Sequence, residues 1–91
     1  MYDETRTAYV VISGEHPLAI AERREDAEAF ALARVTQYRS PDDLPEYRWE
    51  PWGSPGTWRL QSRGKASRRF AWTGYVVHEV PVVGESGVSG V

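Results

Sequence analysis

Five positively charged side chains lie between two tryptophans in the stretch WRLQSRGKASRRFAW, residues 58–72, with no acidic residue among them. The five are Arg59, Arg63, Lys65, Arg68 and Arg69. Guanidinium and ammonium groups hold phosphates or carboxylates, and aromatic rings beside them can stack on bases. The stretch predicts either a binding surface or a solvated hairpin whose arginines prevent pairing at a sheet edge.

The charges are unevenly distributed along the 91 residues. Residues 1–50 carry six basic and eleven acidic side chains, whereas residues 51–78 carry five basic and no acidic ones. The overall net charge of −2 therefore hides a strongly basic segment. Such asymmetry bears on binding partners more than on fold, and it suits an acidic protein, a second copy of the chain or a short nucleic acid.

Few residues suggest catalysis. The histidines are His16, in a turn sequence, and His78, which precedes Glu79 in a strand sequence, where neighbours point to opposite faces. No nucleophile elbow, phosphate-binding loop, dinucleotide motif or metal-ligand spacing occurs, and there is no cysteine. We therefore expect no catalytic residue, no metal and no cofactor. An enzyme with an unrecognised site is the third interpretation, after protein binding and nucleic-acid binding.

Residues 68–75, RRFAWTGY, resemble the RNP1 motif of RNA-recognition motifs. The first Arg, Phe, Ala and Tyr match the motif, whereas Arg69 and Thr73 depart from it. The family's fold has two helices, and only one is predicted here. The motif still favours a sheet face on which Trp58, Phe70 and Trp72 lie together beside a basic turn, although core packing with the aromatics turned inward is the more frequent outcome for such residues.

Two tryptophans surround a proline in the stretch Trp49-Glu50-Pro51-Trp52-Gly53. A core of this size has limited room for four tryptophans, and an exposed tryptophan beside arginine is typical of interface hot spots. We therefore expect Trp52, together with Trp72 and the five basic residues, to contact a partner. The alternative is that Trp52 merely covers the end of the sheet.

Hydrophobic patterns and turn residues place these side chains on a small set of elements. Strands are predicted over 8–13, 18–22, 47–50, 58–63 and 70–83, and one helix over 24–39. The helix has an apolar face of Ala27, Phe30, Ala31, Val35 and Tyr38. Pro51 predicts an edge strand, and Gly74 predicts a bulge.

These elements predict an α+β fold of order β-β-α-β-β-β, with one mostly antiparallel sheet and a single helix packed on one face. We expect one domain over 1–83 and a flexible tail over 84–91. No apolar run is long enough to span a membrane, and the first residues do not resemble a signal peptide.

The segment YVVISGEHPLAIAERREDAEAFALARV, residues 9–35, resembles small uncharacterised proteins of phages and bacteria. Those proteins have a strand, an SGE turn, a second strand and an EDAEAFA-type helix, and the strand ending YVVHEVPV, residues 75–82, resembles their last strand. The resemblance implies a compact cytoplasmic accessory protein and assigns no activity. We therefore predict a non-enzymatic binding domain that recognises a protein, either a different chain or a second copy of itself in a homodimer. Nucleic-acid binding by the 59–69 hairpin is the alternative.

Overall fold

The computed structural model describes residues 6–83, and this part of the chain folds as an α+β unit in the predicted order β-β-α-β-β-β. The elements are β1 (Arg6–Ser13), β2 (His16–Ala21), α1 (Arg24–Thr36), a 3-10 turn η1 (Pro41–Asp43), β3 (Glu46–Pro51), β4 (Thr57–Arg63) and β5 (Ala71–Val82). The predicted tail over 84–91 lies outside the described residues.

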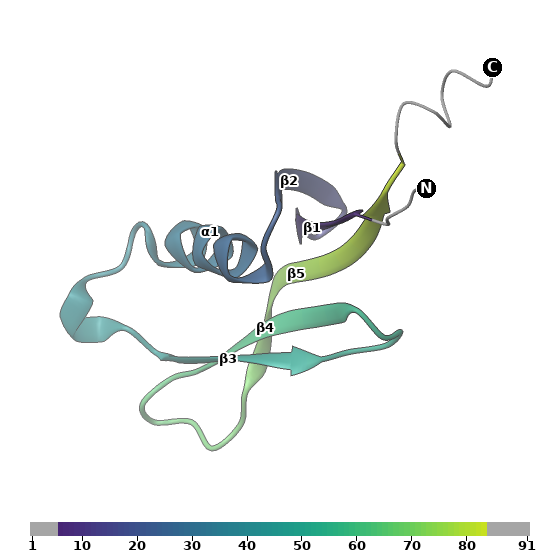
Figure 1. Cartoon of the computed structure of the whole chain (residues 1–91). Coiled ribbons are helices and arrows are strands. Elements are labelled where there is room, and N and C mark those ends of the chain that lie inside the picture. The colour runs from purple at the N-terminus through teal and green to yellow at the C-terminus, as the bar shows by residue number, and fades with distance from the viewer. Residues whose placement is uncertain (1–5, 84–91) are drawn as a thin grey trace.

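The five strands form one antiparallel sheet in the order β2-β1-β5-β4-β3 (Figure 1). Proline cannot donate a ladder hydrogen bond, so it is tolerated in strands at sheet edges. Pro17 lies in β2 and Pro51 lies in β3, and these are the two edge strands. The edge position predicted from Pro51 is therefore confirmed, and β5 occupies the centre of the sheet.

Helix α1 packs on one face of the sheet against β1, β2 and β5 (Figure 1). Val11 of β1, Val77 of β5 and the helix residues Ala27 and Ala31 form a core cluster in which every member is 0% exposed. The two alanines are small, so the helix backbone can approach the sheet closely. The β3–β4 hairpin extends past the helix, and the helix therefore covers only part of that face.

The helix is shorter than predicted, and its apolar face is narrower. It ends at Thr36 rather than Arg39, so Tyr38 lies beyond it and is 92% exposed. Phe30 is 36% exposed, because the side facing the sheet is centred on Ala27 and Ala31 and leaves Phe30 at its rim. The periodic spacing placed both aromatic side chains in the core, and this prediction is wrong.

Gly74 lies in a β-bulge, as predicted, and the register shift between β4 and β5 confirms it. Its φ of +98° is a conformation that favours glycine, and its carbonyl accepts a hydrogen bond of 2.9 Å from the backbone N–H of Gly14. Between the pairs Arg59–Val76 and Gln61–Trp72, three β5 residues stand opposite one β4 residue. Because this number is odd, the alternation of side chains between the two faces is the same before and after the bulge. Residues 72 and 76 therefore point to the same side of the sheet.

Candidate interaction surface

The sheet face opposite α1 is here called the open face. It comprises the even-numbered residues of β1, β3 and β5, the odd-numbered residues of β4, and Ile20 of β2, as the cross-strand pairs require. Core residues that pack with the helix have the opposite parity, for example Tyr9, Trp49 and Trp58. Within residues 6–83 no helix lies over the open face. Its side chains therefore shield the sheet themselves or face solvent.

Two tryptophans from separate segments meet on the open face. Trp52 follows β3, where its N–H donates to the carbonyl of Thr57 at 3.0 Å, and Trp72 belongs to β5. Their ring centroids are 5.5 Å apart at a tilt of 37°, and the Trp72 Nε1 donates to the carbonyl of Tyr75 at 3.2 Å. The rings are held in place, yet they remain 42% and 45% exposed. The two rings together form an ordered, half-exposed aromatic platform.

Phe70 forms a second aromatic centre next to this platform. The guanidinium of Arg48 lies 3.9 Å from the centroid of the Phe70 ring, and that of Arg63 lies 4.6 Å from it. Such cation–π contacts are worth about 0.5–1 kcal/mol each at exposed sites. Arg48 Nε also donates to Oε1 of Gln61 at 2.8 Å. The Phe70 ring is thus contacted by two oriented guanidinium groups.

The arginines of β4 are held by carboxylates of β3. Arg59 Nε donates to Glu50 Oε1 at 2.9 Å, and the Arg59 guanidinium lies 5.4 Å from the Trp52 ring. Arg63 donates to Glu46 Oε1 at 2.6 Å. Both pairs join residues that are partners in the β3–β4 register. The hairpin therefore orients these cations and partly neutralises them.

The other half of the open face is largely aliphatic, and its polar members are Arg6, the partner of Val82, and His78, the partner of Val10. Ile20 of edge strand β2 is 72% exposed, and its cross-strand partner Val10 is partly buried. Ile12 lies beside Val76, and Val82 at the end of β5 is 42% exposed. Apolar side chains thus continue from β2 across β1 to β5, where the aromatic and arginine half begins.

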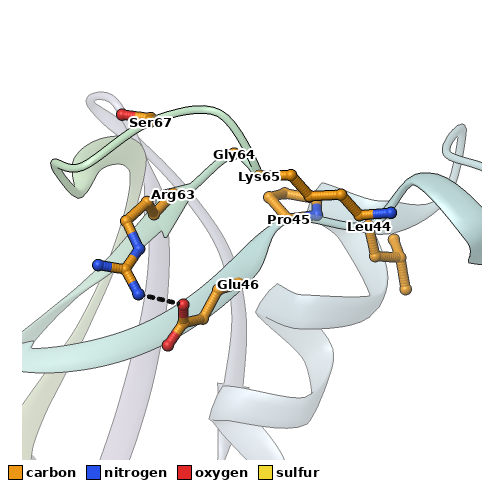
Figure 2. Close-up of a pocket in the computed structure, with 7 residues that line it drawn as sticks. All are labelled: Leu44, Pro45, Glu46, Arg63, Gly64, Lys65 and Ser67. Atoms are coloured by element: carbon orange, nitrogen blue, oxygen red, sulfur yellow. Dashed lines mark hydrogen bonds and ion pairs between the residues drawn. The ribbon is translucent and has the colours of Figure 1, made fainter.

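A loop over residues 64–69, here called the basic loop, connects β4 to β5 and carries Lys65, Arg68 and Arg69. All three are exposed. Lys65 Nζ donates to the carbonyl of Asp42 at 3.0 Å. A shallow pocket of about 350 Å³ lies between this loop and the start of β3, and Figure 2 shows the Arg63–Glu46 pair at its wall. Its remaining lining residues are Leu44, Pro45, Gly64, Lys65 and Ser67.

The open face brings four of the predicted contact residues together, and the basic loop holds the other three beside it. The four are Trp52, Arg59, Arg63 and Trp72. Trp58 does not share this face, contrary to the prediction. It packs against the core on the helix side, with the Arg24 guanidinium 4.0 Å from its ring. The expectation that all the aromatics of the 58–72 stretch turn inward is also wrong, because Trp72 is half exposed.

Two further residues of the open face, Arg48 and Ile20, were not predicted as surface contacts. Arg48 joins the open face through the β3–β4 pairing, and its position over Phe70 depends on residues far apart in the chain. Ile20 is in a short apolar strand that reads as core, but it lies on the uncovered side of an edge strand. The alternation of side chains within Leu18–Ala21 could have separated Ile20 from its neighbours. It does not indicate which of the two sets is exposed unless the face covered by the helix is known.

The histidines lie apart from each other. His16 is exposed at the β1–β2 turn, and His78 is partly buried on the open face with Nδ1 3.1 Å from the Thr57 hydroxyl. Within the part of the chain that the structure describes, no three His, Asp or Glu side chains are placed to hold a metal ion. Across residues 6–83, no helix has the length and apolar character needed to cross a membrane.

Comparison with known proteins adds no relative: the chain matches no family model, no curated protein and no solved structure.

Proposed function

We propose that this protein is a non-enzymatic binding domain whose open face docks onto another protein. The observation that carries the proposal is the ordered Trp52–Trp72 pair, half exposed on a sheet face that no described helix covers. Aromatic residues and arginine are enriched at the centres of protein interfaces, where a few of them dominate the binding energy. The proposed contact residues are Trp52, Arg59, Arg63, Lys65, Arg68, Arg69 and Trp72.

The aliphatic half of the open face supports a protein partner. Monomeric proteins rarely expose a continuous apolar surface larger than a few hundred square ångströms, and larger ones mark interaction sites. Ile20, Val10 and Val82 extend the surface away from the tryptophans, and neither a phosphate nor a base gains from contact with them. A protein surface with its own apolar centre satisfies both halves of the face.

A nucleic acid is the competing occupant, and four contacts weigh against it. Glu46 forms an ion pair with Arg63 and Glu50 forms one with Arg59, and these carboxylates repel phosphates on the same surface. Two guanidinium groups already lie over the Phe70 ring, so a base has to displace one of them before it can stack there. The Trp72 ring and the basic loop are the features that a single-stranded nucleic acid can contact.

Site-specific photo-cross-linking in the native host tests the proposal. A benzoyl-phenylalanine placed at Ile20 reports on the open face, and the same group at Tyr38, which is 92% exposed beyond the helix, is the matched control. We expect a protein adduct from position 20 and little from position 38. The captured protein is then purified, and its affinity for the wild type and for Trp72→Ala is measured by calorimetry, where we expect at least a tenfold loss.

Two results would overturn the proposal. Equal adducts from both positions, or none from position 20, would show that the open face has no preferred protein partner. Alternatively, anisotropy could show that a labelled single-stranded oligonucleotide binds the wild type at physiological salt and not the Arg68→Glu/Arg69→Glu variant. That outcome would assign the surface to nucleic acid.

A further inference from the structure

The cations of the basic loop are available to a partner in a way that Arg59 and Arg63 of β4 are not. Arg59 and Arg63 each pair with a glutamate, whereas Arg68 and Arg69 form no ion pair with any residue of the described chain. Both side chains are exposed, and the two residues directly precede Phe70 in the chain. Their charges are therefore exposed to solvent, within four residues of Trp72 in the chain.

The basic loop presents these cations from an ordered backbone. The Ser67 N–H donates to the carbonyl of Gly64 at 3.0 Å, and the Ser67 hydroxyl accepts from the N–H of Arg69 at 3.1 Å and donates to its carbonyl at 3.0 Å. A turn held in this way loses less conformational entropy when a ligand binds, since its backbone is already arranged.

We propose, on the basis of the function proposed above, that the partner presents an acidic, extended protein segment to this corner of the open face. Its carboxylates pair with Arg68 and Arg69, and an apolar or aromatic side chain packs on the Trp52–Trp72 platform. Arg69 and Trp72 are three residues apart, so at most roughly 10 Å separates their Cα atoms, and an extended partner segment covers that distance in about three residues. The acidic residues and the anchoring side chain of the partner are therefore separated by about the same number of residues.

Charge argues against a second copy of this chain as the occupant. The open face carries four arginines (Arg6, Arg48, Arg59 and Arg63) against Glu46 and Glu50, and the basic loop adds three cations, giving a net charge of +5. In a two-fold dimer the same surface serves both partners, so two such faces would meet. Like charges across an interface disfavour that pairing, and an acidic segment removes the conflict.

The two parts of the surface have separable roles. Exposed charges act over about 8–10 Å at ordinary ionic strength, so the basic loop accelerates encounter and its contribution decreases with salt. The tryptophan platform removes apolar surface from water and mainly sets the dissociation rate. Loss of the cations and loss of the tryptophan therefore produce different kinetic changes for one and the same ligand.

Selection from a library of random peptides displayed on phage tests the inference with a defined probe. We expect the wild-type protein to enrich peptides that combine two or more acidic residues with an apolar or aromatic residue about three positions away. For an enriched peptide, Arg68→Glu/Arg69→Glu is expected to lower the association rate at low salt at least tenfold. Trp72→Ala is expected to raise the dissociation rate by a similar factor.

A matched variant controls for net charge. Arg34→Glu/Arg39→Glu changes the charge by the same amount, at exposed residues in and just after α1, and it is expected to leave peptide binding within about twofold of the wild type. Thermal melts of all variants show whether each is folded. A loss that occurs equally in both double variants would attribute the effect to net charge and overturn the inference.

The failures of the two proposals are distinguishable. Enriched peptides that are neutral or basic, and whose binding still depends on Trp72, would overturn the acidic partner and leave the open face as a protein-binding surface. Enriched peptides that bind Trp72→Ala as tightly as the wild type would overturn both. A photo-adduct between two copies of the chain at Ile20 would replace the acidic segment by self-association.

Discussion

The two faces of the sheet are covered in different ways. On the helix side, the Val11, Val77, Ala27 and Ala31 side chains are completely buried, because a helix with two small residues approaches the strands closely. On the open face, large side chains lie over the sheet and stay half exposed, as Trp72 does. One face is a packed core, whereas the other is a surface built from aromatic and guanidinium groups.

The difference teaches that residue size does not decide which face is the core. Both faces carry large rings: Trp49 and Trp58 pack on the helix side. Trp52 and Trp72 lie on the open face, which no helix within residues 6–83 covers. Large aromatic rings are retained where cation–π and ring contacts orient them. These contacts give the open face order without closing it, which suits the binding role proposed above.

The largest expected effect comes from truncating the buried side chain at the centre of β4. Leu60 is 0% exposed, so Leu60→Ala is expected to lower the free energy of unfolding by about 2–5 kcal/mol. Ile20→Ala removes a similar aliphatic group from the open face and is expected to cost less than about 1 kcal/mol. Urea denaturation measures both. Equal losses would contradict the distinction between the faces.

The same substitution at two tryptophans sharpens the comparison. Trp58 packs against the core cluster, so Trp58→Ala is expected to lower the free energy of unfolding by at least about 2 kcal/mol. Trp72 is half exposed, and Trp72→Ala is expected to cost about 1 kcal/mol. Thermal unfolding followed by circular dichroism provides the values. A larger loss at position 72 would indicate that the platform is structural core.

The bulge that positions Trp72 is tested at Gly74. Its φ of +98° disfavours any residue with a Cβ atom, and nothing lies within 4 Å of where that atom would be placed. The cost of Gly74→Ala is therefore conformational, about 1–2 kcal/mol. Gly64→Ala, at a glycine with equally open surroundings and no positive φ, is the control and is expected to change stability by less than about 1 kcal/mol. Denaturant midpoints that coincide would contradict this account of the bulge.

The smallest effect is expected at Trp49 on the helix side. Its indole Nε1 is buried without a hydrogen-bond partner among the described residues, and a buried unpaired donor costs about 1–3 kcal/mol. Trp49→Phe removes that donor together with part of the ring. We expect the two effects to offset each other and stability to change by less than about 1 kcal/mol. A loss above about 2 kcal/mol in urea denaturation would contradict this compensation.

Much of the fold could be predicted because local signals agreed with one another. Pro51 marked an edge strand, Gly74 marked the bulge, and alternation within β3 and β4 separated Tyr47 and Trp49 from Arg48. The end of the helix was less predictable. Tyr38 continued the apolar spacing, but spacing alone does not indicate where the last backbone hydrogen bond forms.

The surface was predictable as a set of residues and not as an arrangement. The basic loop and both exposed tryptophans could be selected from charge and composition alone. Alternation shows which residues of one strand share a face. The pairing of β4 with β5 determines that Trp58 and Trp72 lie on different faces of the sheet. The contact of Arg48 with Phe70 joins β3 to the residue that lies between the basic loop and β5, and no local sequence pattern indicates it.

The four tryptophans provide the most direct test of the open face as the binding surface. Each gives one indole N–H resonance in a ¹⁵N-correlated spectrum, which single Trp→Phe variants assign. On addition of a selected peptide, the resonances of Trp52 and Trp72 are expected to shift, while those of Trp49 and Trp58 remain within the linewidth. Shifts confined to Trp49 and Trp58, or equal shifts in all four, would contradict binding at the open face.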